Sequence, residues 1–286
     1  MVTESGANVA SPLFSPWAGG VGGVRMGLTR IPADDWLQQP ADMATRLAHK
    51  RALYRQQPQS VIQQLPVAAE VARELLELLQ TRVPTHAPRQ SARSELQSAA
   101  DTFAHLPDIA QAGLLVAEDL CVMQTGDNGD YQLVAASLTA PSYWRLADKI
   151  GKNLKDIHTP VVMLQDRIGS QMSTFFERLE ADTLFMRGNW HVHSSPDWYA
   201  EPGQQEDYSN IQRCFVRTER QTLRRLPRSR AIIFTILVTV TSIGDLSALQ
   251  LAELAMAYQH LHPADAAARH REMVEPPLRA LIAAGS

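Results

Sequence analysis

The sequence contains very little cysteine. Its 286 residues include two cysteines, Cys121 and Cys214, which lie far apart in apolar stretches. A cysteine-ligated iron–sulfur cluster or a zinc knuckle needs several closely spaced thiolates, so this chain alone cannot build either one. Two such residues also give no disulfide framework. We therefore expect two buried thiols in a protein of the reducing cytoplasm.

Excess charge of one sign and long apolar runs are also missing. The net charge is −3 and the pI about 6.3, so there is no general basic field for nucleic acid or anionic membrane. The longest apolar run, residues 231–240 (AIIFTILVTV), is far shorter than the ~20 residues of a membrane-spanning helix. The first residues lack the basic and apolar regions of a signal peptide. We expect a soluble protein that binds neither nucleic acid nor membrane.

Composition and periodicity divide the chain into four predicted regions. These are a Gly-, Ser- and Pro-rich flexible arm (1–24), a helical part packed on a sheet (25–110), a core domain (111–262) and a helical tail (263–286). In the helical part, residues 67–79 (VAAEVARELLELL) repeat apolar residues at helical spacing. The predicted stripe consists of Val67, Val71, Leu75 and Leu78.

The core domain contains five predicted strands. They are residues 119–124, 131–138, 183–193, 212–226 and 230–241. Their connections are short or loop-like rather than the long helices that a parallel sheet requires, which predicts antiparallel pairing. Two strands, a helical insertion and three further strands is the order of a PAS-like domain. We therefore predict an α+β fold, with a PAS-like five-stranded antiparallel sheet and helical additions at both ends.

The fourth predicted strand is unusually rich in arginine. Residues 213–230 (RCFVRTERQTLRRLPRSR) contain seven arginines. In an extended chain one face would carry Arg213, Arg217, Glu219, Gln221 and Arg225, and the other Thr218, Arg220, Thr222 and Arg224. One interpretation is a solvated edge strand. However, the most apolar strand follows directly, which favours a central position where guanidinium groups need anionic partners. Glu219 can satisfy one of them, so a ligand with carboxylates or phosphates would have to supply the rest.

Three histidines raise the question of a metal. His191 and His193 stand two apart on a predicted strand and share a face, but no acidic residue follows at a suitable spacing, which favours two histidines on a solvated face. His158 lies in the apolar segment DIHTPVV. It is either a hydrogen-bonded core residue or a ligand of haem iron. Haem would also bring two propionates, the kind of anion that the arginine-rich strand needs.

Several blocks of the sequence resemble one known family. RMGLTRIPADDWL, AEDLCVMQ, PSYWRLADKIGKNLKDIHTPV, RGNW and VRTERQTLRRLPRSRAIIFTI are similar to blocks of the haem-dependent oxidative N-demethylases. The resemblance runs from about Arg25 to about His262. It implies a haem b in the PAS-fold pocket of a haem-binding subunit. It also implies oxidation of a small secondary amine such as dimethylamine, with dioxygen and with electrons from a separate flavin or iron–sulfur reductase subunit.

The resemblance also suggests roles for particular residues. His158 is the candidate axial ligand of the iron. The candidates for contacts with the propionates or for structural anion contacts are Lys149, Arg217, Arg220 and Arg224. Glu219, Gln221 and Thr222 are the candidate catalytic residues on the substrate side. Trp144 and Trp190 would pack near the porphyrin or in the ordinary core, whereas His191, His193 and Asp197 could set a different amine preference.

Other classes of protein stay open at this point. A haem-based PAS sensor or haem carrier would use the same pocket without catalysis. A non-haem metal protein would use His191 and His193, and a nucleotide-binding protein would use the arginine-rich strand. The sequence has no nucleotide-binding motif and no iron–sulfur ligand set, so an enzyme of this kind must receive its electrons from a partner.

Overall fold

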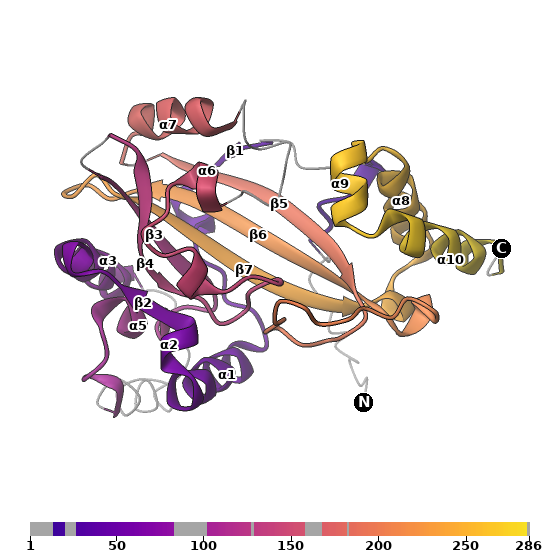
Figure 1. Ribbon diagram of the computed structural model, residues 1–286, viewed down its shortest axis with the longest axis horizontal. Helices are drawn as coiled ribbons and strands as arrows, with labels where there is room; N and C mark the ends of the chain where they lie inside the picture. Colours follow the sequence, from indigo (N-terminus) through magenta and orange to yellow (C-terminus); the bar gives the residue numbers. More distant parts are fainter. Residues whose placement is uncertain are drawn as a thin grey trace, which may run out of the picture.

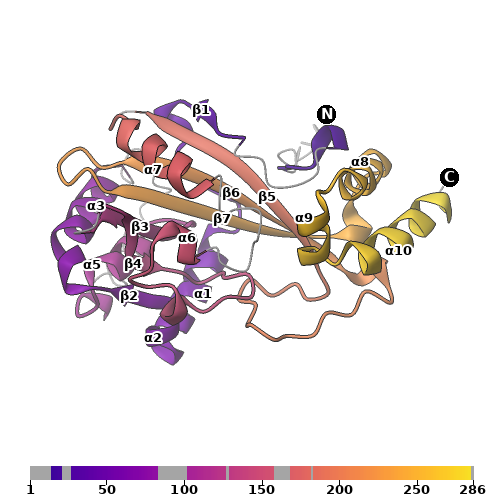
Figure 2. The same cartoon turned by 45° about the horizontal axis from the view of Figure 1, so that its top comes forward.

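The framework of the molecule is a single antiparallel β-sheet with long and short strands. A computed structural model describes residues 14–20, 27–82, 102–126, 129–157, 168–181 and 183–284. Seven strands pair antiparallel in the order β1-β5-β6-β7-β3-β4-β2. The long strands β5, β6 and β7 cross the centre of Figure 1, and Figure 2 shows the same arrangement from a second direction.

The five predicted strands are all present. They are β3 (Asp119–Thr125), β4 (Tyr131–Ser137), β5 (Leu184–His193), β6 (Phe215–Arg225) and β7 (Ile232–Ser242). Each end lies within three residues of its prediction. The predicted α+β class and the antiparallel pairing are therefore confirmed.

The predicted count of five strands was wrong. Strand β1 (Thr29–Ile31) pairs with β5, and β2 (Ile62–Gln64) pairs with β4, so each adds an edge to the sheet. Both strands have three residues. A segment of that length cannot display the alternation of apolar and polar residues by which a strand is detected in sequence.

Helices surround the sheet in three groups. The N-terminal group is α1 (Met43–Gln56), α2 (Pro58–Val61), α3 (Ala69–Arg82) and α5 (Asp108–Gly113). Helices α6 (Leu154–Ile157) and α7 (Ile168–Arg178) lie between β4 and β5 in the chain. The last group is α8 (Ala248–Gln259), α9 (Pro263–Ala268) and α10 (Arg271–Ala284). In the described part of the chain, no helix has the length and apolar character needed to cross a membrane.

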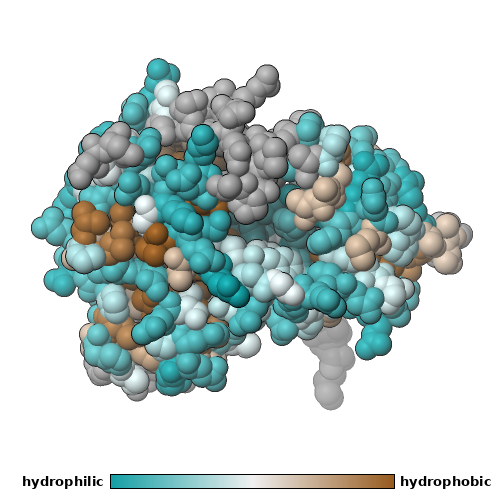
Figure 3. Space-filling view, in the orientation of Figure 1, coloured by the Kyte–Doolittle hydropathy of each residue, from teal (hydrophilic) through white to brown (hydrophobic). Residues whose placement is uncertain are grey.

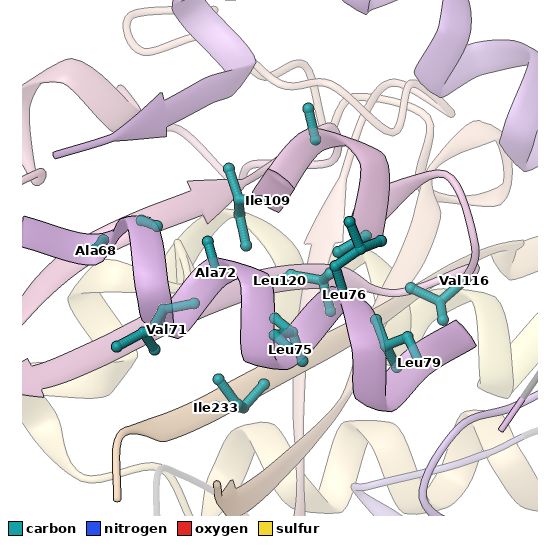
Figure 4. Packing of buried hydrophobic residues seen from close by; sticks show 14 of the residues in the cluster. Ala68, Val71, Ala72, Leu75, Leu76, Leu79, Ile109, Val116, Leu120 and Ile233 are labelled. Atoms are coloured by element: carbon teal, nitrogen blue, oxygen red, sulfur yellow. The ribbon is translucent and has the colours of Figure 1, made fainter. Parts of the chain in front are cut away.

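One face of the sheet packs on α3 and α5. Figure 4 shows Leu75 of α3 close to Leu120 of β3 and Ile233 of β7, and all three side chains are completely buried. The predicted apolar stripe of this helix is correct for Val71 and Leu75. It is wrong for Val67, which is 63% exposed, because Pro66 places this residue in a 3-10 turn before α3 begins.

The other face of the sheet packs on the segment between β4 and β5. Phe176 of α7 is buried there beside Leu223 of β6, and Ile157 at the end of α6 joins the same apolar cluster. We call this face the site face, because it carries the residues discussed next. The residues of this face on β5, β6 and β7 that matter for the site include Arg187, Asn189, His191, Arg217, Glu219, Gln221, Phe234, Ile236 and Val238.

A third cluster closes one end of the sheet. Trp17 is completely buried against α8, where its indole Nε1 donates to the carbonyl of Gln250 at 3.1 Å. In the described part of the predicted arm, residues 14–20, Trp17 is thus packed, whereas Ala18 and Gly19 are exposed. The rest of the arm, residues 1–13 and 21–24, lies outside the described residues. Helices α8, α9 and α10 gather at this end in Figure 1. The space-filling view shows that the surface on this side is hydrophilic over most of its area (Figure 3).

Candidate functional site

The arginine-rich segment forms strand β6 in the interior of the sheet. It lies between β5 and β7, so the prediction of a central position is confirmed and the solvated-edge alternative is wrong. Arg217, Glu219 and Gln221 point to the site face and are at most 9% exposed. The alternation of side chains along a strand therefore brings one carboxylate and several polar groups together in a largely buried position.

Glu219 is the centre of a hydrogen-bonded network on the site face. Its Oε2 accepts from Nε2 of Gln221 at 2.7 Å and from Nδ2 of Asn189 at 3.2 Å. Its other oxygen, Oε1, lies 3.6 Å from Nε of Arg217, which is an ion pair but longer than a hydrogen bond. One oxygen of the carboxylate is thus occupied by two amide donors, and the other retains room for a further donor.

The two amides are themselves oriented by arginines. Nε of Arg187 donates to Oε1 of Gln221 at 2.6 Å, and Nη2 of Arg269 donates to Oδ1 of Asn189 at 2.9 Å. A guanidinium has only donors, so each arginine fixes the amide oxygen on its own side. The amide nitrogens must then face Glu219. Burial lowers the pKa of both arginines, and the negative charge of Glu219 acts in the opposite direction.

Arg217 is anchored to the backbone around the site. It is 1% exposed and donates to the carbonyl of Trp198 at 2.9 Å and to the carbonyl of Ala140. Burial lowers its pKa, whereas Glu219 raises it. Its Nε is buried and makes no hydrogen bond with the described residues. Carbonyl oxygens satisfy the hydrogen bonds of this guanidinium without neutralising its charge, so Glu219 is its anionic neighbour.

Three candidates on β6 lie on the opposite face. Oγ1 of Thr222 is 2.5 Å from Oγ1 of Thr235, and Arg220 donates to the carbonyl of Trp36 at 3.0 Å. The guanidinium of Arg224 stacks on the Trp36 ring at 4.4 Å from its centroid. A ligand beside Glu219 would be separated from all three by the thickness of the sheet. Arg220 and Arg224 share Trp36, which follows β1, as their neighbour, whereas the partner of Thr222 is Thr235 on β7.

The two candidate tryptophans also lie on different sides. Trp144 is partly buried against the apolar cluster of the site face. Trp190 lies on the opposite face and is 2% exposed, edge-on to Trp17 and Tyr258 at centroid distances of 6.4 and 5.1 Å. The surroundings of Trp190 are those of a core residue, as in the alternative that placed this tryptophan in the ordinary core rather than near the porphyrin.

Lys149 binds the backbone at the end of α6. Its Nζ donates to the carbonyl of Ile157 at 2.6 Å, and partial burial together with the nearby charge of Lys152 lowers its pKa. Ile157 packs in the apolar cluster of the site face. The next residue in the chain, His158, lies outside the described residues, and so the structure does not test its predicted role.

The histidine pair on β5 is not on a solvated face. His193 is 2% exposed, and its Nδ1 lies 2.9 Å from the hydroxyl of Tyr143, a residue with a positive φ of 59°. Burial and the nearby Arg217 and His270 lower the pKa of His193 to about 3. The solvated-face prediction was wrong because Tyr143 and Glu206, from two loops, cover the strand here.

A three-ligand metal site is not found in the described ranges, whether around His191 and His193 or elsewhere among histidine, cysteine, aspartate and glutamate side chains. Asp197 does not join the pair either. Its carboxylate accepts from the hydroxyl of Ser195 at 2.6 Å in an exposed turn.

Sequence reasoning missed three members of the network. Arg187 and Asn189 lie in the short motif RGNW, whose resemblance to the family was the available signal. Their role depends on the register, which sets Arg187 opposite Gln221 and Asn189 opposite Glu219. Arg269 comes from the tail and has no sequence signal, because nothing in its own segment indicates what it contacts.

A buried carboxylate with oriented amides and arginines of lowered pKa is typical of a ligand-binding or catalytic domain. Residues 27–278 match the family described as haem-dependent oxidative N-demethylase, alpha subunit-like. This match covers every strand of the sheet and most of the surrounding helices. The chain therefore belongs to that family, as the sequence motifs predicted.

The described residues on the site face provide two of the three features that a haem requires. Haem needs apolar surfaces for its ring, cationic donors for its propionates and a ligand for its iron. Phe234, Ile236 and Trp144 are partly buried apolar side chains that pack against the same cluster. Arg217 presents a buried Nε without a hydrogen-bond partner among the described residues. These groups match the apolar body and the anionic edge of the cofactor.

Proposed function

We propose that this chain is the haem-binding subunit of an amine oxidase that removes a methyl group from a small secondary amine, and that Glu219 binds the amine. The observation that carries this proposal is the asymmetry of the Glu219 carboxylate. Oε2 accepts from both amides, whereas Oε1 has Arg217 at 3.6 Å as its polar neighbour among the described residues. Oε1 is the oxygen that would accept from an ammonium group.

The chemistry of the substrate matches this oxygen. A secondary alkylamine is protonated near neutral pH and carries N–H donors and apolar methyl groups. A largely buried carboxylate binds such a cation through a charge-assisted hydrogen bond that water screens only weakly. Ile236 and Val238 stand beside Gln221 and Glu219 on β7 and would contact the methyl groups. This arrangement favours small amines over larger polar ones.

We also propose residues for the contacts with haem b. His158 is the proposed iron ligand, supported by the packing of its neighbour Ile157 in the apolar cluster of the site face. Arg217 and Lys149 would contact the propionates, and Trp144 would pack on the ring. For Arg220, Arg224, Thr222 and Trp190 we now propose structural roles, because the sheet separates them from Glu219.

The bound haem supplies the redox chemistry, in which dioxygen is activated for oxidation of the methyl carbon. One amine, one dioxygen, two electrons and two protons give formaldehyde, the amine with one methyl group fewer, and water. Glu219 would hold the nitrogen in place and stabilise its positive charge as the carbon is oxidised. The two electrons would come from a partner subunit with a flavin or an iron–sulfur cluster, a proposal supported by the family's description as an alpha subunit.

Two further properties remain part of this proposal. A PAS-like topology is supported by the chain order, in which β3 and β4 precede the helices α6 and α7, and β5 to β7 follow them. A cytoplasmic location is supported by Cys121 and Cys214, which are both buried free thiols.

Formaldehyde release tests the proposal. Purified protein loaded with haem, supplied with dimethylamine, dioxygen and an artificial reductant, should release formaldehyde and methylamine in equal amounts. Glu219→Gln should depress this turnover without lowering the haem content, and Glu77→Gln on the exposed side of α3 serves as the control. Equal turnover by wild type and Glu219→Gln would contradict the assigned role, as would a variant whose only defect is loss of haem.

A further inference from the structure

Arg269 connects the C-terminal tail with the candidate site. It follows α9, is 4% exposed, and its guanidinium lies over the Trp190 ring at 4.6 Å from the centroid. From there Nη2 reaches Oδ1 of Asn189 at 2.9 Å, across 80 residues of sequence. The tail thereby places a buried cation one hydrogen bond away from a residue that contacts Glu219.

The backbone of the tail holds Arg269 in a defined position. Its N–H donates to the carbonyl of Asp265 at 3.0 Å, and its carbonyl accepts from the hydroxyl of Tyr258 at 3.5 Å. The following residue, His270, has a positive φ of 52°, which turns the chain sharply before α10. The packing of the tail thus holds the backbone of Arg269, and its guanidinium extends from there to Trp190 and Asn189 of β5.

This contact decides which way the Asn189 amide faces. A carboxamide has an oxygen that only accepts and a nitrogen that only donates. Because Arg269 can only donate, the oxygen must point toward the tail, and Nδ2 then faces Oε2 of Glu219 at 3.2 Å. Without Arg269, a rotation of the amide would bring its oxygen toward the carboxylate, and the hydrogen bond would become a repulsion.

On the other side of Glu219 the same logic applies. Arg187 orients Gln221, whose Nε2 donates to the same Oε2 at 2.7 Å. Two arginine–amide pairs from opposite directions therefore occupy one oxygen of the carboxylate. Because both amides donate to Oε2, Oε1 stays available for a hydrogen bond from the amine.

We propose that Arg269 is a positioning residue that acts through Asn189 to orient Glu219 for amine binding, which makes the C-terminal tail part of the substrate site. This inference rests on the proposed role of Glu219 as the amine-binding carboxylate. It assigns Arg269 no contact with the substrate. The tail would set the affinity for the amine, and the haem would be bound independently of it.

The test is a double-mutant cycle on amine binding. Isothermal titration calorimetry with dimethylamine on the haem-loaded protein gives the dissociation constant without any turnover. Arg269→Gln should weaken binding roughly tenfold, because Nδ2 of Asn189 is then no longer held toward Oε2 of Glu219. Arg269→Lys, which keeps a donor and a charge, should restore most of the affinity. Arg271→Gln, a neighbouring arginine that pairs with Glu275 at 2.6 Å, is the control and should bind as wild type does.

The cycle separates positioning from a general structural effect. In an Asn189→Ala background, adding Arg269→Gln should change the dissociation constant for dimethylamine by less than ~2-fold, because the residue that transmits the contact is gone. Equal effects of Arg269→Gln in both backgrounds would overturn the inference, and so would wild-type affinity in Arg269→Gln. If Arg269→Gln does not fold, Asn189→Ala with and without Arg269→Lys completes the cycle.

Failure of the inference and failure of the proposed function are distinguishable. If Glu219→Gln loses affinity for dimethylamine and Arg269→Gln does not, only the role of Arg269 is wrong. If Glu219→Gln binds the amine as tightly as wild type does, Glu219 is not the amine-binding carboxylate and both proposals fail.

Discussion

Single residues on the site face owe their properties to burial beside charged neighbours. His193 is the clearest case, because burial, Arg217 and His270 all disfavour its protonated form. The neutral ring can then accept a hydrogen bond from Tyr143 at 2.9 Å. The positive φ of Tyr143 is a strained conformation for a residue with a side chain, and this contact compensates for part of the strain.

The depressed pKa of His193 predicts a dependence of stability on pH. The folded protein keeps this ring neutral down to a pH of about 3, whereas the unfolded chain protonates it near 6.5. The unfolded state binds more protons between these values, so this contribution to stability is complete above pH 6.5 and is lost as the pH falls. Between pH 6.5 and 4.5 the loss should be about 2 kcal/mol.

Urea unfolding at these two pH values measures the effect. From pH 6.5 to 4.5, the free energy of unfolding should fall by about 2 kcal/mol more in wild type than in His193→Gln. The variant lacks the titrating ring, while other groups contribute equally to both proteins. An identical fall in the free energy of unfolding for the two proteins would mean that His193 is not held neutral by its surroundings.

At the scale of elements, the β6–β7 hairpin is attached to α3 at its turn. Glu74 of α3 is 4% exposed and accepts from the backbone N–H groups of Arg228 at 2.7 Å and Ser229 at 2.9 Å. Arg230 in the same turn has a positive φ of 60°. This attachment matters for the site, since the turn sets the register in which Glu219 and Gln221 stand.

Removal of the Glu74 carboxylate should therefore destabilise the protein. Glu74→Ala would leave two N–H groups without their acceptor, which we expect to lower the free energy of unfolding by about 2–3 kcal/mol in chemical denaturation. Glu77→Ala is the matched control, because Glu77 is half exposed and pairs with the Arg228 side chain, a contact worth less than about 1 kcal/mol. Equal effects of the two variants would show that the carboxylate does not anchor the turn.

Elements with long periodic patterns could be predicted from the sequence, and short ones could not. The strands β5 to β7 are ten or eleven residues long, and the two-residue period of an extended chain also predicted the two faces of β6. Partners across strands depend on register and on distant loops, which no local pattern contains. For this reason Glu219 was found, but Asn189 and Arg187 were not, and the burial of His193 was missed.

At the scale of the whole molecule, separate apolar clusters stabilise different parts of one sheet. Trp17, Trp190 and Tyr258 belong to the cluster that joins the N-terminal segment to α8 and α10. Leu75 belongs to the cluster between the sheet and α3. The N-terminal segment thus stabilises α8 and α10, which lie before and after Arg269 in the chain.

This organisation predicts local rather than uniform effects of core substitutions. Trp17→Ala should lower the local unfolding free energy of its own cluster by about 3–5 kcal/mol. Amide hydrogen exchange should therefore accelerate mainly in α8 and α10. Leu75→Ala, the control in the other cluster, should accelerate exchange mainly in α3 and α5. Indistinguishable exchange patterns in the two variants would mean that the molecule opens as a single unit.

The most direct test of the account is an optical titration of the haem-loaded protein with dimethylamine. Wild type should show an intense Soret band that shifts as the amine binds. Glu219→Gln should keep the band and require at least ~10-fold more amine for the same shift, since one charge-assisted hydrogen bond is lost. Absence of a Soret band, or the same titration curve for both proteins, would contradict the claim that Glu219 binds an amine beside a haem.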